Sequence, residues 1–127
     1  MEFESTEQMQ MVYETLNNIK IAITRLEERS LNINSVDDYL LSPSGMEKLD
    51  AACMVIIALG EAVKGLDKLT DGQLLCDYPE IYWQGIMKMR DKIAHHYFEI
   101  DADVVFKTLK EDIPPMLPVI DKMMQGI

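Results

Sequence analysis

The chain of 127 residues contains only two cysteines and six glycines, and it has no long hydrophobic run. The cysteines lie 23 positions apart, and Cys53 stands in an apolar stretch where a thiol acts as a small hydrophobic side chain. We therefore expect neither a disulfide scaffold nor a zinc site. The longest apolar run, residues 51–59, is far shorter than the roughly 20 residues that cross a bilayer. Residues 1–15 lack the basic and apolar parts of an export signal. These absences predict a cytoplasmic protein without a membrane segment.

Basic side chains are scarce as well. The chain carries 12 lysines and arginines against 22 aspartates and glutamates, a formal net charge of -10. This excess of acid argues against a general nucleic-acid coat, which presents a broad basic face, so any nucleic acid has to be bound locally. The 48% content of hydrophobic residues argues against disorder. Because a chain of this length has room for one hydrophobic core, we expect a single domain over residues 1–127.

Strand signals are missing too, since the sequence has no hairpin dipeptide such as Asn-Gly and no regular alternation of apolar and polar residues. Apolar residues instead recur at steps of three and four, the spacing of amphipathic helices. The sequence thus predicts an all-α, up-and-down bundle of four to six helices. Long helices are expected over residues 6–30, 43–65 and 77–95, short ones near residues 35 and 70, a further one from Asp101, and a break at Pro114, Pro115 and Pro118.

The helix over residues 43–65 is the expected spine of the bundle. Its centre, AACMVIIAL, is apolar on every side, and a helix of this kind is buried all round. Glu61 then stands as a charged residue at the end of this helix. The ten methionines lie mostly at core spacing, so we expect them to fill the core rather than to bind a metal.

Common enzyme motifs are absent, because no Gly-rich phosphate loop, no His-Glu-x-x-His and no Cys-x-x-Cys occur. A di-iron bundle is excluded because no glutamate stands three residues before either histidine. Reactive side chains gather in one segment, Lys88–Tyr97, which holds both histidines, three cations and one anion. Its charge of +2 contrasts with nine cations and 21 anions, or -12, in the rest of the chain. This segment is the candidate site.

Within the segment, Arg90, His95 and Tyr97 suit cleavage of RNA without a metal. A ribose 2′-hydroxyl attacks the neighbouring phosphate, a histidine moves the protons and an arginine holds the developing charge. His95 stands near a helix C-terminus, whose dipole favours the imidazolium, and Asp91 lies four residues earlier on the same face. Arg90 and His95, however, are five positions apart, about 140° around a helix. Two copies across a dyad would gather both residue types in one groove, so we expect a homodimer.

Structural or surface roles, rather than catalytic ones, are also possible for these residues. An arginine or histidine at a helix end is commonly solvated or ion-paired. Tyr97 is either an interface aromatic or a residue with a specific functional or regulatory role. His96 and Lys92 are surface residues or supporting contacts of the site. Glu61 is either an exposed carboxylate or the ion-pair partner of Arg90.

The spacing Arg90-x4-His95-x-Tyr97 resembles the Arg-x4-His-x-Tyr motif of HEPN domains, and the whole chain resembles their HepT-like toxin branch. The likeness extends to residues on both sides of the motif, namely Gly60-Glu61-Ala62, Pro79, Trp83, Tyr97-Phe98-x-Ile100-Asp101 and Asp112-Ile113-Pro114.

The resemblance implies an all-α homodimer with the motif in a cleft between the subunits. It implies a metal-independent endoribonuclease toxin that needs no cofactor, with RNA as its substrate and Arg90 and His95 as its catalytic residues. It also implies a minimal nucleotidyltransferase antitoxin of the MntA-like kind, which transfers AMP to the motif tyrosine, here Tyr97. The chain has Asp91 where the family often has asparagine, and an anion beside a phosphate site predicts weaker affinity for RNA.

A function of another class is also compatible with these residues. The chain would then be a non-catalytic dimeric module that docks a nucleotidyltransferase or holds its nucleotide substrate with the same helix end. Growth arrest on expression of the chain alone separates the two functions, because only the toxin requires it.

Overall fold

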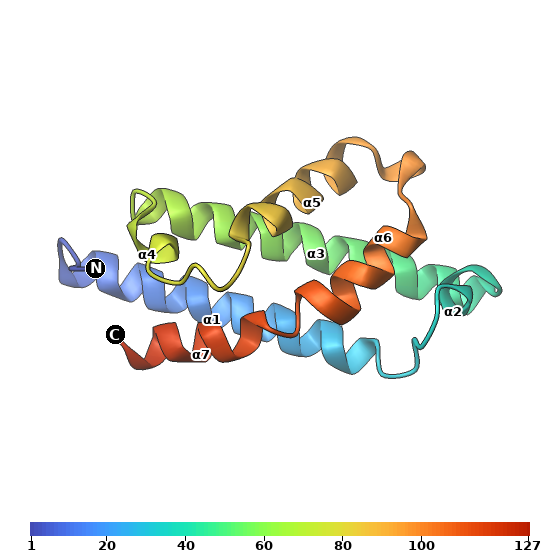
Figure 1. The fold of residues 1–127 in the computed structure, drawn as a ribbon, viewed down its shortest axis with the longest axis horizontal. Coiled ribbons are helices and arrows are strands. Elements are labelled where there is room, and N and C mark those ends of the chain that lie inside the picture. Colours follow the sequence, from blue (N-terminus) through green and yellow to red (C-terminus); the bar gives the residue numbers. More distant parts are fainter.

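A computed structural model of the chain describes all 127 residues and confirms the all-α class (Figure 1). The elements follow in the order α1 (Thr6–Arg29), α2 (Asp37–Leu40), α3 (Pro43–Leu69), α4 (Gln73–Cys76), α5 (Trp83–His95), a 3-10 turn (Tyr97–Glu99), α6 (Ala102–Lys107), a π-helical turn (Thr108–Asp112) and α7 (Met116–Gln125). The short helices expected near residues 35 and 70 are α2 and α4, but the expected total of four to six helices is too low, because the segment with Pro114 and Pro115 separates α6 from α7. No helix combines the length and the apolar character that crossing a bilayer requires.

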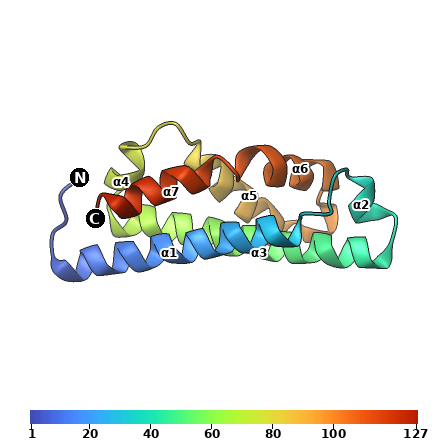
Figure 2. The same ribbon diagram turned by 90° about the horizontal axis from the view of Figure 1, so that it is seen from below.

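The longest helices, α1 and α3, run side by side in opposite directions and form one layer of the bundle (Figures 1 and 2). Helix α5 packs against α3, and α7 packs against α1, on the same side of this layer (Figure 2). Short helices α2 and α4 lie at opposite ends of α3 (Figure 1). Because α3 contacts α1, α2, α4, α5 and α6, it is the spine that the sequence predicted.

Side-chain caps begin three helices at the positions that the sequence indicated. The Ser5 hydroxyl accepts a hydrogen bond from the Gln8 backbone at 3.0 Å at the start of α1. Ser42 does the same for Gly45 at 2.9 Å at the start of α3. The Asp101 carboxylate accepts from the Asp103 backbone at 2.9 Å and begins α6. These caps satisfy backbone N–H groups that have no partner inside the helix, so the starts of these three helices could be predicted from the local sequence.

The predicted start of the third long helix is wrong, because α5 begins at Trp83 and not at Asp77. Asp77 instead follows the last residue of α4, and its carboxylate pairs with the N-terminal amine at 3.1 Å. The Trp83 indole donates to the Tyr78 carbonyl at 2.9 Å. The aspartate that resembles a helix cap is thus used in a tertiary contact, and the residues before Trp83 form a turn.

The predicted end of α3 is also wrong, since the helix continues past Gly65 to Leu69. A glycine inside a helix costs about 1 kcal/mol relative to alanine. Burying a leucine contributes about 1.5 to 3 kcal/mol, and Leu66 is fully buried. The helix therefore runs through Gly65, and Glu61 lies in its interior rather than at its end.

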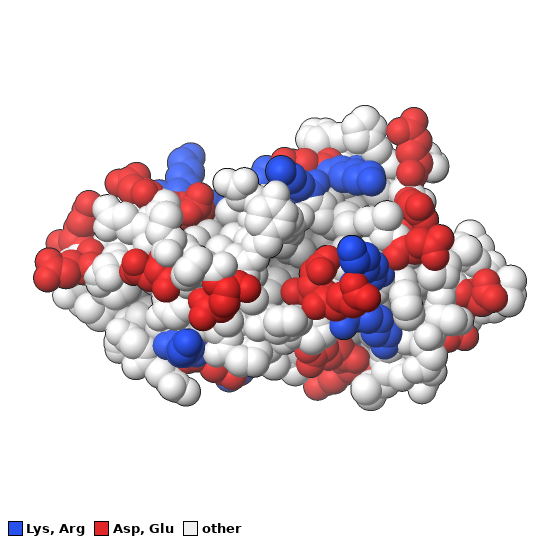
Figure 3. All heavy atoms as spheres, in the orientation of Figure 1, with Lys and Arg blue, Asp and Glu red and all other residues white.

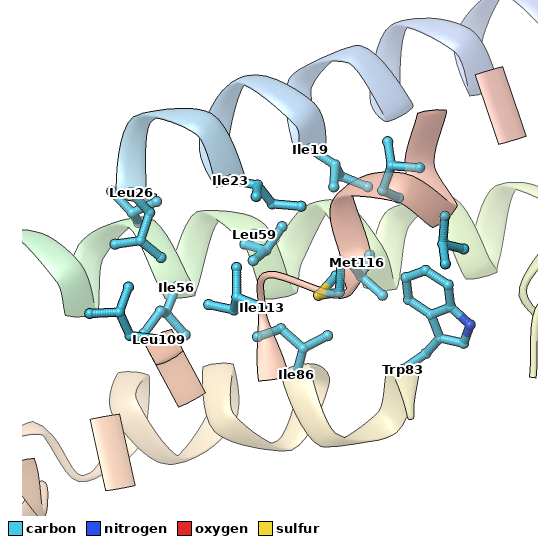
Figure 4. Close-up of a cluster of buried hydrophobic side chains, with 14 of the residues drawn as sticks. Ile19, Ile23, Leu26, Ile56, Leu59, Trp83, Ile86, Leu109, Ile113 and Met116 are labelled. Carbon is cyan, nitrogen blue, oxygen red and sulfur yellow. The ribbon is translucent and has the colours of Figure 1, made fainter. Parts of the chain in front are cut away.

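One hydrophobic core joins the four main helices. Side chains from α1, α3, α5 and the segment leading into α7 converge on it, and Figure 4 labels Ile19, Ile23, Leu26, Ile56, Leu59, Trp83, Ile86, Leu109, Ile113 and Met116. Trp83 and Ile86 anchor the first turn of α5 in this core (Figure 4). The same packing holds the last turns of α5, where the candidate site lies.

One face of α3 is left uncovered. Met46, Asp50 and Met54 follow one another at four-residue steps, so they lie on a single strip of the helix, which we call the open strip. The two methionines are 53% and 66% exposed. The expectation that α3 is buried all round is therefore wrong on this side. The expectation that methionines fill the core is wrong for half of them, since the exposed ones are Met1, Met9, Met11, Met46 and Met54.

Candidate active site

The segment Lys88–Tyr97 covers the last turns of α5 and the first residue of the 3-10 turn beyond it. Helix α5 ends at His95, as the sequence predicted. Figure 3 shows lysine and arginine side chains gathered over α5, while acidic groups are spread over the rest of this face. The side chains of Lys92 and His95 lie in the last turn of the helix, where a cation interacts favourably with the helix dipole.

Arg90 lies where α5 approaches α3 most closely. A Cβ atom placed on Gly60 would stand 2.3 Å from the Arg90 Cβ and 2.9 Å from its Cγ. Both distances are below van der Waals contact, so only glycine at this position lets the two helices come so near. The side chain of Arg90 is 23% exposed. Gly60 thus lets the first carbons of the arginine side chain pack against α3, and the guanidinium extends to Glu61 of the same helix.

Gly60→Ala is expected to displace Arg90 together with α5. Overpacking of this kind costs about 1 to 3 kcal/mol of stability, and we expect RNA cleavage to fall with it. Urea denaturation and a cleavage assay measure the two effects. Gly65→Ala on the same helix is the matched control, because a Cβ there meets nothing within 4 Å and the exchange should stabilise the protein by about 0.5 to 1 kcal/mol. A Gly60→Ala protein with unchanged stability and activity would contradict the role of this contact.

The charged end of Arg90 lies in a group of four side chains that are linked by ion pairs. The Glu61 carboxylate lies 2.6 Å from the Arg90 Nε, although the N–H is not aligned for a hydrogen bond. The Asp91 carboxylate accepts from Arg90 Nη1 at 3.0 Å and, with the same oxygen, from Lys64 Nζ at 2.6 Å. We call these four residues the charge cluster. Of the two alternatives for Glu61, pairing with Arg90 is the one that the structure supports.

Asp91 makes its hydrogen bonds and ion pairs inside the charge cluster and forms neither with His95. Hydrogen bonds from the Lys64 ammonium and the Arg90 guanidinium lower the pKa of Asp91 below its usual range. The carboxylate therefore stays ionised at neutral pH. Its negative charge is offset by Lys64, a residue that the sequence did not single out.

The two histidines differ in their surroundings. His95 is exposed and takes part in no hydrogen bond or ion pair. His96 follows the end of α5, and its Nδ1 lies 3.5 Å from a Glu99 carboxylate oxygen at the surface. The contact of His96 agrees with its interpretation as a surface residue. The imidazole of His95 has no such partner and is free to contact a ligand. Lys92 is exposed beside it.

Tyr97 is tied back to the open strip of α3. Its hydroxyl donates a hydrogen bond to the Asp50 carboxylate, and the side chain remains 44% exposed. This hydrogen bond, together with burial, raises the pKa of Tyr97 to about 12, so the group is a neutral phenol at physiological pH. The ring of Phe98 meets Tyr97 edge-on with 5.7 Å between centroids and is completely exposed. The exit of the motif is therefore aromatic, apolar and open to solvent.

Arg90 and His95 point in different directions within one chain. Because α5 stays α-helical through His95, the five residues between them correspond to about 140° of rotation. A hollow of about 480 Å³ lies between α5 and the α6–α7 region, and neither Arg90 nor His95 lines it or the other principal hollows of the chain. One copy of the chain thus presents the two reactive groups in different directions and outside its principal hollows.

Two contacts of the site were not found from the sequence. Asp50 is 47 residues before Tyr97, and Lys64 is 27 residues before Asp91. Both belong to α3 and reach the motif only through the packing of α5 on α3. Periodicity indicates which face of a helix is buried but not its rotation against a distant helix, so no local signal identified either residue.

Comparisons with known proteins identify the family of the chain. The family described as Ribonuclease HepT-like matches residues 19–123. A protein of Thermococcus cleftensis named "Probable ribonuclease HepT" is 35% identical over 108 residues, 85% of this chain and 91% of the relative. "Putative RNase MJ0127" of Methanocaldococcus jannaschii is 26% identical over 116 residues, 91% and 86% of the two chains. No solved structure matches significantly. The match covers most of the bundle and the whole motif, and the chain belongs to the HepT-like ribonuclease family.

Proposed function

We propose that this protein is a metal-independent endoribonuclease toxin that acts as a homodimer, with residues 1–127 forming one HEPN domain. The observation that carries the proposal is the family's Arg-x4-His-x-Tyr motif on a helix end that leaves His95 exposed and unpaired. Arg90 supplies the guanidinium for a phosphate, and His95 supplies an exposed imidazole that can accept and give a proton.

The reaction needs two proton transfers and one centre of negative charge. In the proposed step, the 2′-oxygen of a ribose bonds to the adjacent phosphorus, and the bond from phosphorus to the 5′-oxygen of the next nucleotide breaks. His95 of one copy accepts the proton of the 2′-hydroxyl, and the partner subunit's His95 gives a proton to the leaving 5′-oxygen. Arg90 stabilises the charge that develops on the phosphoryl oxygens.

The open strip of α3 supports the proposed dimer. Met46 and Met54 of this strip lie on the helix face that Tyr97 reaches through Asp50, and Phe98 adds a fully exposed ring at the same end of the motif. An exposed apolar surface of this kind is typical of a protein interface. A second copy covering it would place two motifs side by side and supply the cleft that a single chain lacks.

The proposed antitoxin is a minimal nucleotidyltransferase that adds AMP to Tyr97. The exposed hydroxyl is accessible to another enzyme, and a phosphodiester on it would place negative charge and a bulky nucleoside beside the cations of the motif. The added phosphate would compete with RNA for those cations. Modification is thus expected to stop cleavage by electrostatics and by steric hindrance together.

Co-expression with such a nucleotidyltransferase tests the proposal. Expressed alone, the chain should arrest growth, and the purified protein should cut RNA in buffer containing EDTA. After co-expression, intact mass spectrometry should show additions in steps of one AMP, and both effects should be lost.

Tyr97→Phe is the control, because it lacks the hydroxyl and should stay unmodified and toxic. Full modification of Tyr97→Phe would refute Tyr97 as the acceptor. A protein that leaves RNA intact and growth unaffected would instead favour the non-catalytic binding module.

A further inference from the structure

Lys64 of α3 is the one cation of the charge cluster that lies outside the motif. Its ammonium is 2.6 Å from the Asp91 oxygen that also accepts from Arg90 at 3.0 Å. One carboxylate oxygen therefore holds a lysine and an arginine next to each other. The Lys64 side chain is 37% exposed, and Asp91 is its only ion-pair partner. The ammonium is thus both positioned and reachable from solvent.

The position of Lys64 follows from the packing of α3 on α5. Gly60 and Glu61 lie four and three residues before Lys64, so all three belong to the side of α3 that faces Arg90. Glu61 contacts the guanidinium from one side, and Lys64 reaches Asp91 from the next turn. An anion that enters between Arg90 and Lys64 meets two donors at once.

The chemistry of this pair suits a phosphate. A phosphate group offers several oxygens to separate cationic donors, as a carboxylate does, and an arginine with a lysine is a common combination for binding one. In the free protein the Asp91 carboxylate occupies the place between the two cations. A backbone phosphate of RNA that displaces this carboxylate would gain both contacts.

We propose that Lys64 binds a backbone phosphate of the RNA substrate beside Arg90, and that Asp91 holds its ammonium in position until RNA arrives. This inference rests on the proposed ribonuclease function. The sequence predicted that the Asp91 anion weakens RNA binding, and the inference adds a second role, because the same carboxylate brings a distant cation to the site.

RNA binding as a function of salt concentration tests the proposal. The measurement uses labelled single-stranded RNA and the His95→Ala protein, which should bind without cutting. Lys64→Gln in this background is expected to weaken binding roughly 10-fold, as for the loss of a charged hydrogen bond. It should also reduce the slope of log affinity against log salt by about 0.7, because one phosphate contact is lost. Lys64→Arg should keep most of the affinity and the slope.

Two further variants separate a phosphate contact from a merely structural ion pair. Lys64→Gln introduced together with Asp91→Asn should still weaken binding relative to Asp91→Asn alone, because the phosphate contact does not need the carboxylate. Lys20→Gln is the matched control. Its ammonium pairs with Asp121 at 2.7 Å and is similarly exposed, but it joins α1 to α7 in the other half of the bundle (Figure 1). Its loss should leave both affinity and slope unchanged.

The outcomes distinguish this inference from the proposed function. If the His95→Ala protein binds RNA and Lys64→Gln changes neither affinity nor slope, the assignment of Lys64 is wrong and the ribonuclease proposal stands. An effect of Lys64→Gln that disappears in the Asp91→Asn background also overturns the assignment, because the lysine would then act only through Asp91. If the protein with native His95 neither binds nor cuts RNA, the proposed function itself fails.

Discussion

His95→Ala is expected to lower the rate of RNA cleavage by about 10² to 10⁴-fold, because one positioned proton-transfer residue is typically worth that much. The side chain is exposed and forms no hydrogen bond or ion pair, so the variant should unfold at nearly the same temperature as the parent and should still bind RNA. Single-turnover cleavage in EDTA measures the rate. Arg90→Ala should also lose cleavage, with weaker RNA binding in addition.

His96→Ala is the matched control for His95. The two imidazoles are adjacent and both exposed, but His96 lies beside Glu99 and outside the fixed positions of the motif. Its removal should cost far less activity. Equal losses at the two positions would mean that the proton-transfer role has been given to the wrong histidine, and full activity of His95→Ala would refute the proposed mechanism.

Met54→Glu is expected to convert the proposed dimer of about twice 14.6 kDa into an inactive monomer. Met54 is 66% exposed on the open strip, so a glutamate there is well hydrated in the single chain. In a dimer that covers the strip, the same charge would be buried without a partner, which is unfavourable by several kcal/mol. Sedimentation velocity gives the mass, and the EDTA cleavage assay gives the activity.

Leu31→Glu provides the comparison for Met54→Glu. Leu31 is 75% exposed in the loop after α1, away from the motif, and the same change of charge there should leave mass and activity as in the parent. A Met54→Glu protein that stays dimeric would show that the second copy binds elsewhere. A fully active monomer would overturn the composite site altogether.

Local sequence signals predicted the elements that local contacts determine. Ser5 and Ser42 begin α1 and α3 as expected, and Asp101 begins α6, because each cap is completed within three residues. Asp77 has the same chemistry but pairs with the N-terminal amine, a contact that depends on the folded chain. The sequence could not distinguish these cases, since only the tertiary structure decides which aspartate is free to cap a helix.

The candidate site also has features that the local sequence predicts and features that depend on tertiary packing. The spacing of Arg90, His95 and Tyr97 is visible in the sequence. The rotation of about 140° around the helix axis between Arg90 and His95 follows from that spacing. The side chains that contact the motif could not be predicted, because Asp50 and Lys64 belong to α3 and are distant from the motif in sequence. Their positions depend on how far apart and at what rotation two helices pack, which follows from side-chain volumes along the whole contact.

The close contact of Arg90 with Gly60 also has an entropic consequence. Fixing an arginine side chain in one rotamer costs up to about 2 kcal/mol of conformational entropy. Here the first carbons of the side chain are confined between two helices, and its end is held by Glu61 and Asp91. Most of this ordering therefore takes place when the protein folds. A phosphate that reaches the helix end meets an arginine that is already immobilised, so little rotamer freedom remains to be lost on binding.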